Sequence, residues 1–331
     1  MSLVSIVIPC YNEQATISLL LEALDSQTYP RPDMEVIIAD GMSTDGTRQE
    51  IAKFQQEHPA LRVKVIDNPK RIIPSGLNRA IEAAEGEYII RVDAHSTPYP
   101  DYIANCISAL EGGLGDNVGG VWEIRPSRQT WIARAIASAA AHPLAVGDAR
   151  YRYTDHAQLA DTIPFGAFRR SLIERVGMFD ETLEANEDYE FNLRVRLAGG
   201  KIWLDPRIRS VYFARPTLKS LARQYGRYGY WKAQMLRRYP KSIRWRQMLP
   251  PLFVLSLLIL GILSLWLTSA RFLLGFEISA YLLILLGTGI VDGLKRHSVS
   301  LALGLPLAIA TMHFAWGTAN LWGYIRTLRP V

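Results

Sequence analysis

The chain has 331 residues, of which 49% are hydrophobic and 21% are charged, and its formal net charge is +6. This length exceeds a typical single domain, and the composition excludes a disordered or fibrous chain. The two cysteines, Cys10 and Cys106, are too few for a disulfide scaffold or a zinc site built from cysteines. They fit a reducing compartment.

The N-terminal part of the chain alternates short apolar runs with helical patterns. Apolar runs cover residues 4–9, 34–39, 63–67 and 88–92, and residues 15–25, 47–57 and 75–85 have helical character. This order predicts an α/β fold with a mainly parallel sheet and helices on both faces.

Polar residues follow the ends of the predicted strands, among them Glu13, Asp40, Asp93 and His95. In open α/β sheets, ligands bind at the carboxyl ends of the strands. The sequence has no G-x-G-x-x-G after the first strand and no G-x-x-x-x-G-K-[ST] motif. A nicotinamide dehydrogenase and a P-loop NTPase are therefore disfavoured.

Positive charge is concentrated in one segment, residues 215–247, which contains ten Lys and Arg and no acidic residue. Residues 1–214 contain 22 Lys and Arg against 29 Asp and Glu. Tyr and Trp are interleaved with the basic residues, which is typical of interfacial helices on anionic lipid. The same mixture could bind RNA, but the apolar runs that follow favour membrane lipid as the partner, and no nucleic acid.

Three long apolar runs within residues 248–331 predict membrane spans at about 249–269, 272–292 and 299–321. The basic segment before the first span and the basic residues 295–297 after the second predict a multi-pass inner (plasma) membrane protein whose N-terminal domain is cytoplasmic. Residues 2–10 lack the length and basic flank of a signal peptide.

Four segments together resemble a known family. They read VSIVIPCYNE, ADGMSTDGT, YIIRVDAHS and ANEDYEFNLR, in this order. They are similar to the four motifs of inverting glycosyltransferase family 2, whose fold is GT-A. Aspartate-alanine-histidine in place of aspartate-x-aspartate, and the short set of C-terminal spans, resemble succinoglycan-type exopolysaccharide glucosyltransferases. The resemblance implies a GT-A nucleotide-sugar-binding domain over residues 1–214, followed by interfacial helices over 215–247 and a transmembrane region over 248–331.

The resemblance also implies residues for the donor site. It assigns nucleotide-sugar binding to Pro9, Tyr11, Glu13, Asp40 and Asp93. Asp93 and His95 stand at the metal motif, so they are expected to hold a divalent cation, Mn or Mg, on the donor diphosphate. Such a cation removes the repulsion between phosphates and carboxylates, and an imidazole ligand suits Mn better than Mg.

Asp188 aligns with the catalytic base of the family. Transfer with inversion needs one carboxylate to take the proton of the acceptor hydroxyl. A helix N-terminus lowers the pKa of Asp188, whereas burial and Glu187 raise it, and we expect it to be ionised at neutral pH. Glu187 is expected on the acceptor or diphosphate side.

Gln224, Arg227 and Tyr228 resemble the glutamine-x-x-arginine-tryptophan motif of membrane synthases, with tyrosine replacing tryptophan. The resemblance places them at the acceptor or diphosphate, where an arginine can grip phosphate oxygens. Anchoring at the membrane interface is the alternative role.

The expected function is transfer of glucose from UDP-glucose, a UDP-sugar donor, onto a polyprenyl-diphosphate-linked saccharide acceptor in exopolysaccharide biosynthesis. A polyprenyl-phosphate sugar synthase and a processive polysaccharide synthase are alternatives, although three spans are few for a translocation channel. A non-catalytic nucleotide-sugar-binding membrane scaffold is an alternative of another class. The presence of both Asp93 and Asp188 argues against it.

Overall fold

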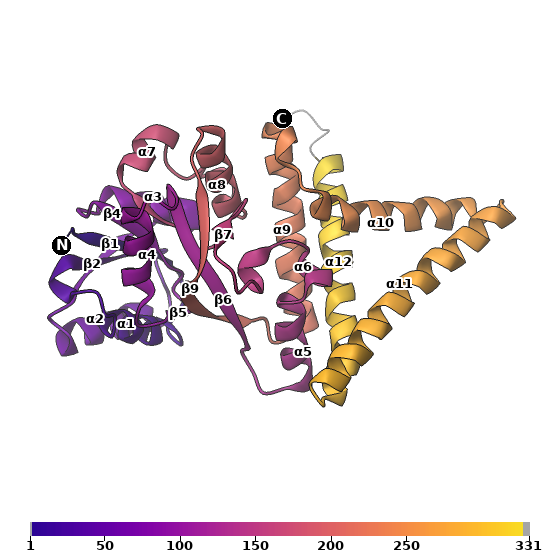
Figure 1. The fold of residues 1–331 in the computed structure, drawn as a ribbon, viewed down its shortest axis with the longest axis horizontal. Coiled ribbons are helices and arrows are strands. Elements are labelled where there is room, and N and C mark those ends of the chain that lie inside the picture. Colours follow the sequence, from indigo (N-terminus) through magenta and orange to yellow (C-terminus); the bar gives the residue numbers. More distant parts are fainter. Residues whose placement is uncertain (1, 327–331) are drawn as a thin grey trace. The chain divides into compact units, whose positions relative to one another are not determined.

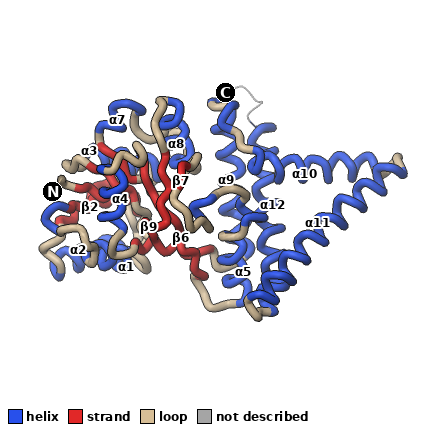
Figure 2. The backbone as a smooth tube through the Cα atoms, viewed as in Figure 1, coloured by secondary structure: helices blue, strands red, loops and turns tan. Residues whose placement is uncertain are grey.

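The computed structural model of the protein describes residues 2–326. The chain folds into two compact units. The first contains the residues up to 123 and residues 150–212, and the second contains residues 124–149 and the residues from 213 onward. Most strands belong to the first unit, and the second is mostly helical (Figures 1 and 2). The sequence suggested a catalytic, an interfacial and a transmembrane region with boundaries at residues 214 and 247. These three regions remain a prediction.

One sheet dominates the first unit. Its parallel strands are β1 (Val4–Cys10), β2 (Met34–Asp40), β3 (Arg62–Asp67) and β4 (Tyr88–Arg91). Shorter or later strands extend it, namely β5 (Ser96–Pro98), β6 (Asn117–Pro126), β7 (Gln158–Leu159), β8 (Ala167–Arg169) and β9 (Ile202–Ala214). The strand order is β3-β2-β1-β4-β8-β6-β9-β5, with β7 beside β9. The predicted parallel arrangement is confirmed for β1–β4, and β4 pairs with β8 in antiparallel orientation.

Helices cover both faces of this sheet because side chains of the central strands alternate. Ile6 and Ile8 of β1 pack in one buried cluster with α1 (Ile17–Asp25) and α4 (Tyr102–Glu111). Val7 packs in a second cluster with α3 (Ile73–Glu82) and α8 (Glu187–Leu197). The remaining helices of this unit are α2 (Thr47–Glu57) and α7 (Ser171–Val176), with 3-10 turns at Arg31–Asp33 and Arg150–Arg152.

The helix predicted over residues 75–85 lies at Ile73–Glu82 and ends three residues earlier than expected. The reason is a buried acid on the neighbouring strand. Glu35 Oε1 accepts hydrogen bonds from the backbone N–H groups of Glu85, at 2.6 Å, and Gly86, at 3.2 Å. These donors turn the chain toward β4 instead of continuing the helix.

The second unit contains α5 (Trp131–Ala140), α6 (Pro143–Val146), α9 (Leu218–Arg238), α10 (Trp245–Leu263), α11 (Thr268–Lys295) and α12 (Val299–Arg326), with a 3-10 turn at Pro240–Ser242. Three of them, α10, α11 and α12, are long and apolar enough to cross a membrane. The three predicted spans therefore coincide with helices, which extend beyond the predicted bounds at most ends.

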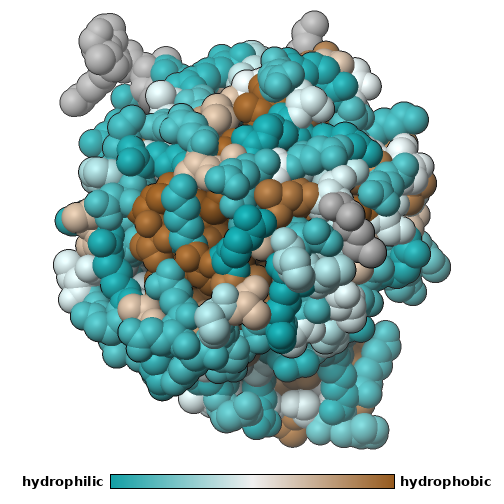
Figure 3. All heavy atoms as spheres, turned by 90° about the vertical axis from the view of Figure 1, so that its left-hand side faces the viewer, coloured by the Kyte–Doolittle hydropathy of each residue, from teal (hydrophilic) through white to brown (hydrophobic). Residues whose placement is uncertain are grey.

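Within this unit α9 runs beside α12 (Figure 1). Gly229 packs against the backbone of Trp316, and Asn320 Nδ2 donates a 3.0 Å hydrogen bond to the Gly229 carbonyl. Helices α10 and α11 instead expose large hydrophobic side chains, among them Leu258, Phe272 and Phe276. The face of the molecule in Figure 3 is mostly hydrophilic, with its largest hydrophobic area left of the centre and smaller ones elsewhere. The exposed apolar surface of α10 and α11 suits contact with lipid.

Candidate active site

The parallel strands bring three loops together at their carboxyl ends. The register pairs Cys10 of β1 with Asp40 of β2, and Asp40 with Asp67 of β3. The loops beyond these strands contain Asn12, Met42 and Arg71, whose φ angles are 54°, 58° and 57°. Non-glycine residues seldom adopt this left-handed conformation, and it concentrates at ligand-binding sites. The carboxyl edge of the sheet is therefore the first place to look for a site.

A buried arginine organises the centre of this region. Arg91 ends β4 and is 3% exposed. Its Nη2 lies 3.0 Å from Asp93 Oδ1 and 3.0 Å from Glu187 Oε1, and its Nη1 donates to Asp188 Oδ1. One guanidinium thus joins the predicted metal residue Asp93 to the predicted base Asp188. We call these four residues the Arg91 cluster.

Helix α8 presents Glu187 and Asp188 because its core side is firmly anchored. The left-handed residue Asn186, with φ 66°, precedes its first turn. Phe191 stacks on Phe179 with a centroid separation of 4.6 Å. Asn192 Nδ2 donates to Thr162 Oγ1, at 3.0 Å, and to the Ile163 carbonyl, at 3.1 Å. These contacts hold the first turn of α8 against the end of β4.

Three carboxylates face one guanidinium, and burial affects the pKa values of Arg91 and Asp188. Burial alone would lower the pKa of Arg91, but the ion pairs to Asp188, Asp93 and Glu187 raise it, so Arg91 stays charged. Burial raises the pKa of Asp188 to about 8. Arg91 opposes this rise, and the carboxylates of Glu187 and Asp93 add to it.

The sequence led us to expect an ionised Asp188 at neutral pH. In the structure, burial outweighs the ion pair with Arg91, so the pKa of Asp188 is about 8 and not below neutral pH. A pKa close to the working pH is favourable for a general base. About a quarter of the Asp188 side chain, 26%, is exposed, so a substrate can reach it.

A second contact joins residues that were predicted for different roles. His95 Nδ1 lies 3.1 Å from Glu13 Oε1. Glu13 Oε2 accepts a 2.5 Å hydrogen bond from Thr16 Oγ1. A turn after β4, closed by the 3.0 Å bond from Ser96 N to the Asp93 carbonyl, carries both Asp93 and His95. The loops after β1 and β4 therefore meet at this pair.

Asp40 is fully buried, and its carboxylate is already engaged. Oδ1 accepts from Ser43 Oγ at 2.5 Å, and Oδ2 accepts from Arg48 Nε at 2.5 Å. Arg48 Nη2 also donates to Asp67 Oδ1 at 2.5 Å. We call Asp40, Arg48 and Asp67 the Arg48 cluster. Contact of a bound base with Asp40 requires Ser43 or Arg48 to move aside or to share its acceptor.

Tyr11 offers an exposed ring at the same edge. The side chain is 43% exposed. It lies over Gly41, where an added Cβ would come 3.1 Å from Tyr11 Cδ2, so glycine favours this close approach. The Arg71 guanidinium carbon lies 5.9 Å from the ring centroid. Pro9 pairs with Ala39 in the sheet, next to this loop.

Gln224, Arg227 and Tyr228 lie on α9, in the second unit. Gln224 Nε2 donates a 3.2 Å hydrogen bond to Tyr228 Oη, as residues four apart on a helix can. Arg227 is exposed. The structure thus brings Gln224 and Tyr228 together on one helical face.

Comparison with known proteins identifies the family of this chain. A model of the family described as glycosyl transferase family 2 matches residues 5–177. The chain is also 32% identical over 319 residues to the succinoglycan biosynthesis protein ExoA of Rhizobium meliloti (strain 1021), covering 96% of this chain and 93% of that protein. The chain belongs to glycosyl transferase family 2.

Another relative comes from Methanococcus voltae. It is named dolichyl N-acetyl-alpha-D-glucosaminyl phosphate 3-beta-D-2,3-diacetamido-2,3-dideoxy-beta-D-glucuronosyltransferase. It is 31% identical over 271 residues, which cover 80% of this chain and 83% of that protein.

Solved structures share the fold of this family 2 glycosyltransferase. The mannosyltransferase PcManGT from Pyrobaculum calidifontis, solved with GDP-Man and Mn2+, has a TM-score of 0.63 at 22% identity, over 97% of this chain and 87% of that one. TarS of S. aureus has a TM-score of 0.51 at 16% identity, over 96% of this chain and 55% of that one. The predicted GT-A fold is confirmed.

The candidate metal ligands at this site are few, so a cation bound here would take its other ligands from substrate or water. Among residues 2–326, no group of three or more His, Cys, Asp or Glu could hold a metal. Asp93 and His95 offer two side chains on one turn. Mg2+ in phosphate sites is usually held by one or two carboxylates together with substrate phosphates and water. Asp93 and His95 therefore fit a cation that arrives with a diphosphate.

Sequence motifs did not reveal the roles of Arg91 and Arg48. Arg91 interrupts an apolar strand two residues before the metal motif, and this position was a usable signal. Its partners Glu187 and Asp188 follow 96 and 97 residues later, so their convergence became visible only in the fold. Arg48 lies in the first turn of α2 and gave no distinct signal.

Proposed function

We propose that this glycosyltransferase moves glucose from UDP-glucose, with inversion, onto a polyprenyl-diphosphate-linked saccharide in exopolysaccharide biosynthesis. The observation that carries the proposal is the Arg91 cluster, because it ties a reachable base to the carboxylate of the metal motif. The name of the R. meliloti relative supports the pathway. The name of the M. voltae relative supports an acceptor sugar carried on a polyprenyl lipid.

Asp188 is the proposed base. Arg91 holds Oδ1 and fixes the direction of the carboxylate, while the exposed part of the side chain can meet the acceptor hydroxyl. Asp188 takes the hydroxyl proton as the oxygen bonds to the anomeric carbon. The bond from that carbon to UDP breaks on the opposite face, which inverts the configuration. Glu187, on the same turn of α8, keeps Arg91 in place.

On the donor side, Asp93 and His95 would hold a divalent cation, Mn or Mg. It would neutralise charge on the diphosphate and stabilise UDP as a leaving group. Glu13 orients His95 through their 3.1 Å contact. We assign the uracil to the Tyr11 ring, beside Pro9, with Asp40 accepting a hydrogen bond from the base. Stacking on a tyrosine is a common mode of base binding.

On the acceptor side, we assign Gln224, Arg227 and Tyr228 to the diphosphate and first sugars of the lipid-linked acceptor. The basic segment 215–247 would lie on the cytoplasmic face of the plasma membrane, and α10, α11 and α12 would cross it. An acceptor carried on a lipid stays at the bilayer surface, where such a segment can reach it.

The test is product analysis with membranes that contain the full chain. UDP-glucose, UDP-galactose, UDP-GlcNAc and GDP-mannose are offered in turn with polyprenyl-diphosphate-linked saccharides and with polyprenyl phosphate. We expect transfer from UDP-glucose to the diphosphate-linked saccharide, with inverted anomeric configuration by NMR. Preference for GDP-mannose, or transfer to polyprenyl phosphate itself, would replace the proposed donor or acceptor. Membranes that contain Asp188→Asn serve as the matched control.

A further inference from the structure

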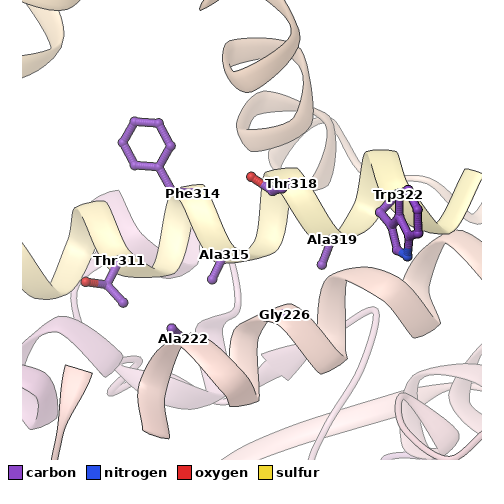
Figure 4. A pocket seen from close by; sticks show the side chains of 8 residues that line it. All are labelled: Ala222, Gly226, Thr311, Phe314, Ala315, Thr318, Ala319 and Trp322. Atoms are coloured by element: carbon purple, nitrogen blue, oxygen red, sulfur yellow. The ribbon is translucent and has the colours of Figure 1, made fainter. Parts of the chain in front are cut away.

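A shallow apolar groove lies between α9 and α12 within the second unit, with a volume of about 560 Å³. Ala222 and Gly226 of α9 form one side, and Ala315, Thr318, Ala319 and Trp322 are among the α12 residues on the other (Figure 4). This volume falls in the range of about 300–1,000 Å³ that is usual for small-molecule sites. Nothing above assigns a ligand to it.

The groove exists because the two helices touch closely at some glycines and leave space at another. Gly229 packs on the backbone of Trp316, and Gly323 packs on Ala233, so neither position has room for a larger side chain. An added Cβ on Gly226 would have no neighbour nearer than 3.9 Å. The space beside Gly226 is therefore open to occupation without repacking of the helix pair.

The α9 side of the groove carries a row of positive charge. Arg215, Lys219, Arg223 and Arg227 follow each other at intervals of four residues, and all are exposed. This spacing places Lys219, Arg223 and Arg227 on one face of α9. Arg223 and Arg227 each come directly after a residue of the groove wall. The three helical positions extend over about 12 Å at 1.5 Å per residue.

The α12 side is apolar and exposed. Phe314 and Trp322, which line the groove, are 41% and 55% exposed. Alanine, glycine and aromatic surfaces offer few hydrogen-bond partners, so the groove suits a hydrocarbon chain and not a sugar. Its row of cations suits phosphates at the polar end of such a chain.

We propose that this groove binds one acyl chain of an anionic glycerophospholipid, whose headgroup phosphate rests on Lys219 and Arg223. The positive charge along α9 favours a lipid with an anionic headgroup as the occupant of the groove. A row of cations longer than one diphosphate matches neighbouring headgroups in an anionic leaflet, and α10–α12 are helices that suit a bilayer. The proposal does not rest on the identity of donor or acceptor.

The headgroup is tested by native mass spectrometry of the full chain in detergent with added phosphatidylglycerol or phosphatidylcholine of identical acyl chains. We expect preferential retention of phosphatidylglycerol. Lys219→Gln with Arg223→Gln should lower that preference about tenfold or more, since each basic residue near an anionic surface contributes severalfold. Arg237→Gln with Arg238→Gln removes the same charge from the same helix and should change it less. Equal retention of the two lipids by the parent chain would overturn the proposal.

The groove itself is tested by filling it. Gly226→Leu should reduce lipid retention, because its side chain enters the open space. Gly287→Leu is the matched control, since an added Cβ on Gly287 of α11 has no neighbour within 4 Å and one on Gly226 has none nearer than 3.9 Å. Thr318→Leu, at an exposed wall position, is a second filling variant in case Gly226→Leu does not fold, as judged by circular dichroism. Unchanged retention in a folded filling variant would overturn the site.

A competition experiment tests whether the groove binds a phospholipid or the acceptor lipid. A polyprenyl phosphate added at equal concentration should not displace phosphatidylglycerol from the parent chain. If it does, and if Gly226→Leu abolishes its binding, the groove belongs to the acceptor lipid and the phospholipid proposal fails. Sugar transfer to a water-soluble acceptor analogue reports on the proposed function separately.

Discussion

Two arginines near the carboxyl edge of one sheet have different surroundings. Arg48 bonds two carboxylates, and its side chain is 42% exposed. Arg91 bonds three carboxylates, and its side chain is 3% exposed. In the Arg48 cluster, water can solvate Arg48 and Asp67, which are both exposed. In the Arg91 cluster the excess negative charge is shielded from water, so it raises a carboxyl pKa and favours a cation. Both clusters contain arginine–carboxylate ion pairs. They differ in the burial of the arginine and in the number of carboxylates around it.

The largest expected effect concerns a cation at the Arg91 cluster. We expect EDTA to abolish transfer, and Mn to restore it at least as well as Mg, because His95 offers a nitrogen ligand beside Asp93. The measurement is UDP release coupled to product formation in washed membranes. Calcium serves as a charge-matched control that imidazole suits poorly. Full activity in chelator would remove the cation from the proposed mechanism.

The second prediction concerns the base. Asp188→Asn should lower transfer about 100-fold or more, the usual scale for loss of general-base catalysis. The amide still accepts from Arg91, so UDP affinity measured by calorimetry should change little. Turnover similar to that of the parent chain would show that another group takes the proton.

The third prediction concerns the contribution of Arg91 to stability, which we expect to exceed that of Arg48. Arg91→Met leaves the buried Glu187 and the partly buried Asp93 and Asp188 without their guanidinium, so it should lower the free energy of unfolding by about 3–5 kcal/mol. Arg91→Lys should recover part of this loss, because the charge returns without the fork that bonds three acids. Detergent-solubilised protein unfolded by urea provides the measurement. Parent-like stability of Arg91→Met would mean that water reaches the cluster freely.

The fourth prediction concerns pH. The pKa of Asp188 is raised to about 8, so the folded chain binds more protons than the unfolded chain between pH 4 and 8. By linkage, this group makes the free energy of unfolding fall as the pH rises through that window. Glu187→Gln removes a like charge and should lower the pKa of Asp188. The acid limb of the transfer–pH profile should then move to lower pH and the stability slope should flatten. A shift to higher pH would contradict the charge argument.

The sequence predicted the parallel half of the fold better than the antiparallel half. Strands β1–β4 and their helices follow clear local periodicity, which can be read without knowing which strands pair. Strand β8 has only three residues, Ala167–Arg169, and exists because it pairs with β4 and β6. Such a strand has no local pattern to detect.

The candidate site likewise contains residues that the sequence predicted and residues whose roles became visible only in the fold. Asp93, His95 and Asp188 were found from motifs, and the structure places Asp93 and Asp188 on one guanidinium. Arg91 was missed because its role depends on contacts across nearly a hundred residues. The enclosure of Asp40 was also missed, since burial of a carboxylate at a strand end depends on how Arg48 and Ser43 fold over it.

The smallest expected effect concerns Arg48 and decides how Asp40 acts. Arg48→Met leaves the buried Asp40 carboxylate with Ser43, and water replaces an arginine that was already half in solvent. We expect a loss of about 1–3 kcal/mol in the free energy of unfolding, below that of Arg91→Met. If Asp40 bonds the base directly, Arg48→Met leaves Oδ2 with only the 3.1 Å hydrogen bond from the Ser43 backbone N–H, and the donor KM should change no more than about twofold. Asp40→Asn should raise the donor KM about tenfold, the scale of one charged hydrogen bond. Steady-state kinetics with UDP-glucose compare the two variants. An equal rise in both would mean that Asp40 serves the donor only by holding Arg48, so that the guanidinium and not the carboxylate would be the group that meets the nucleotide.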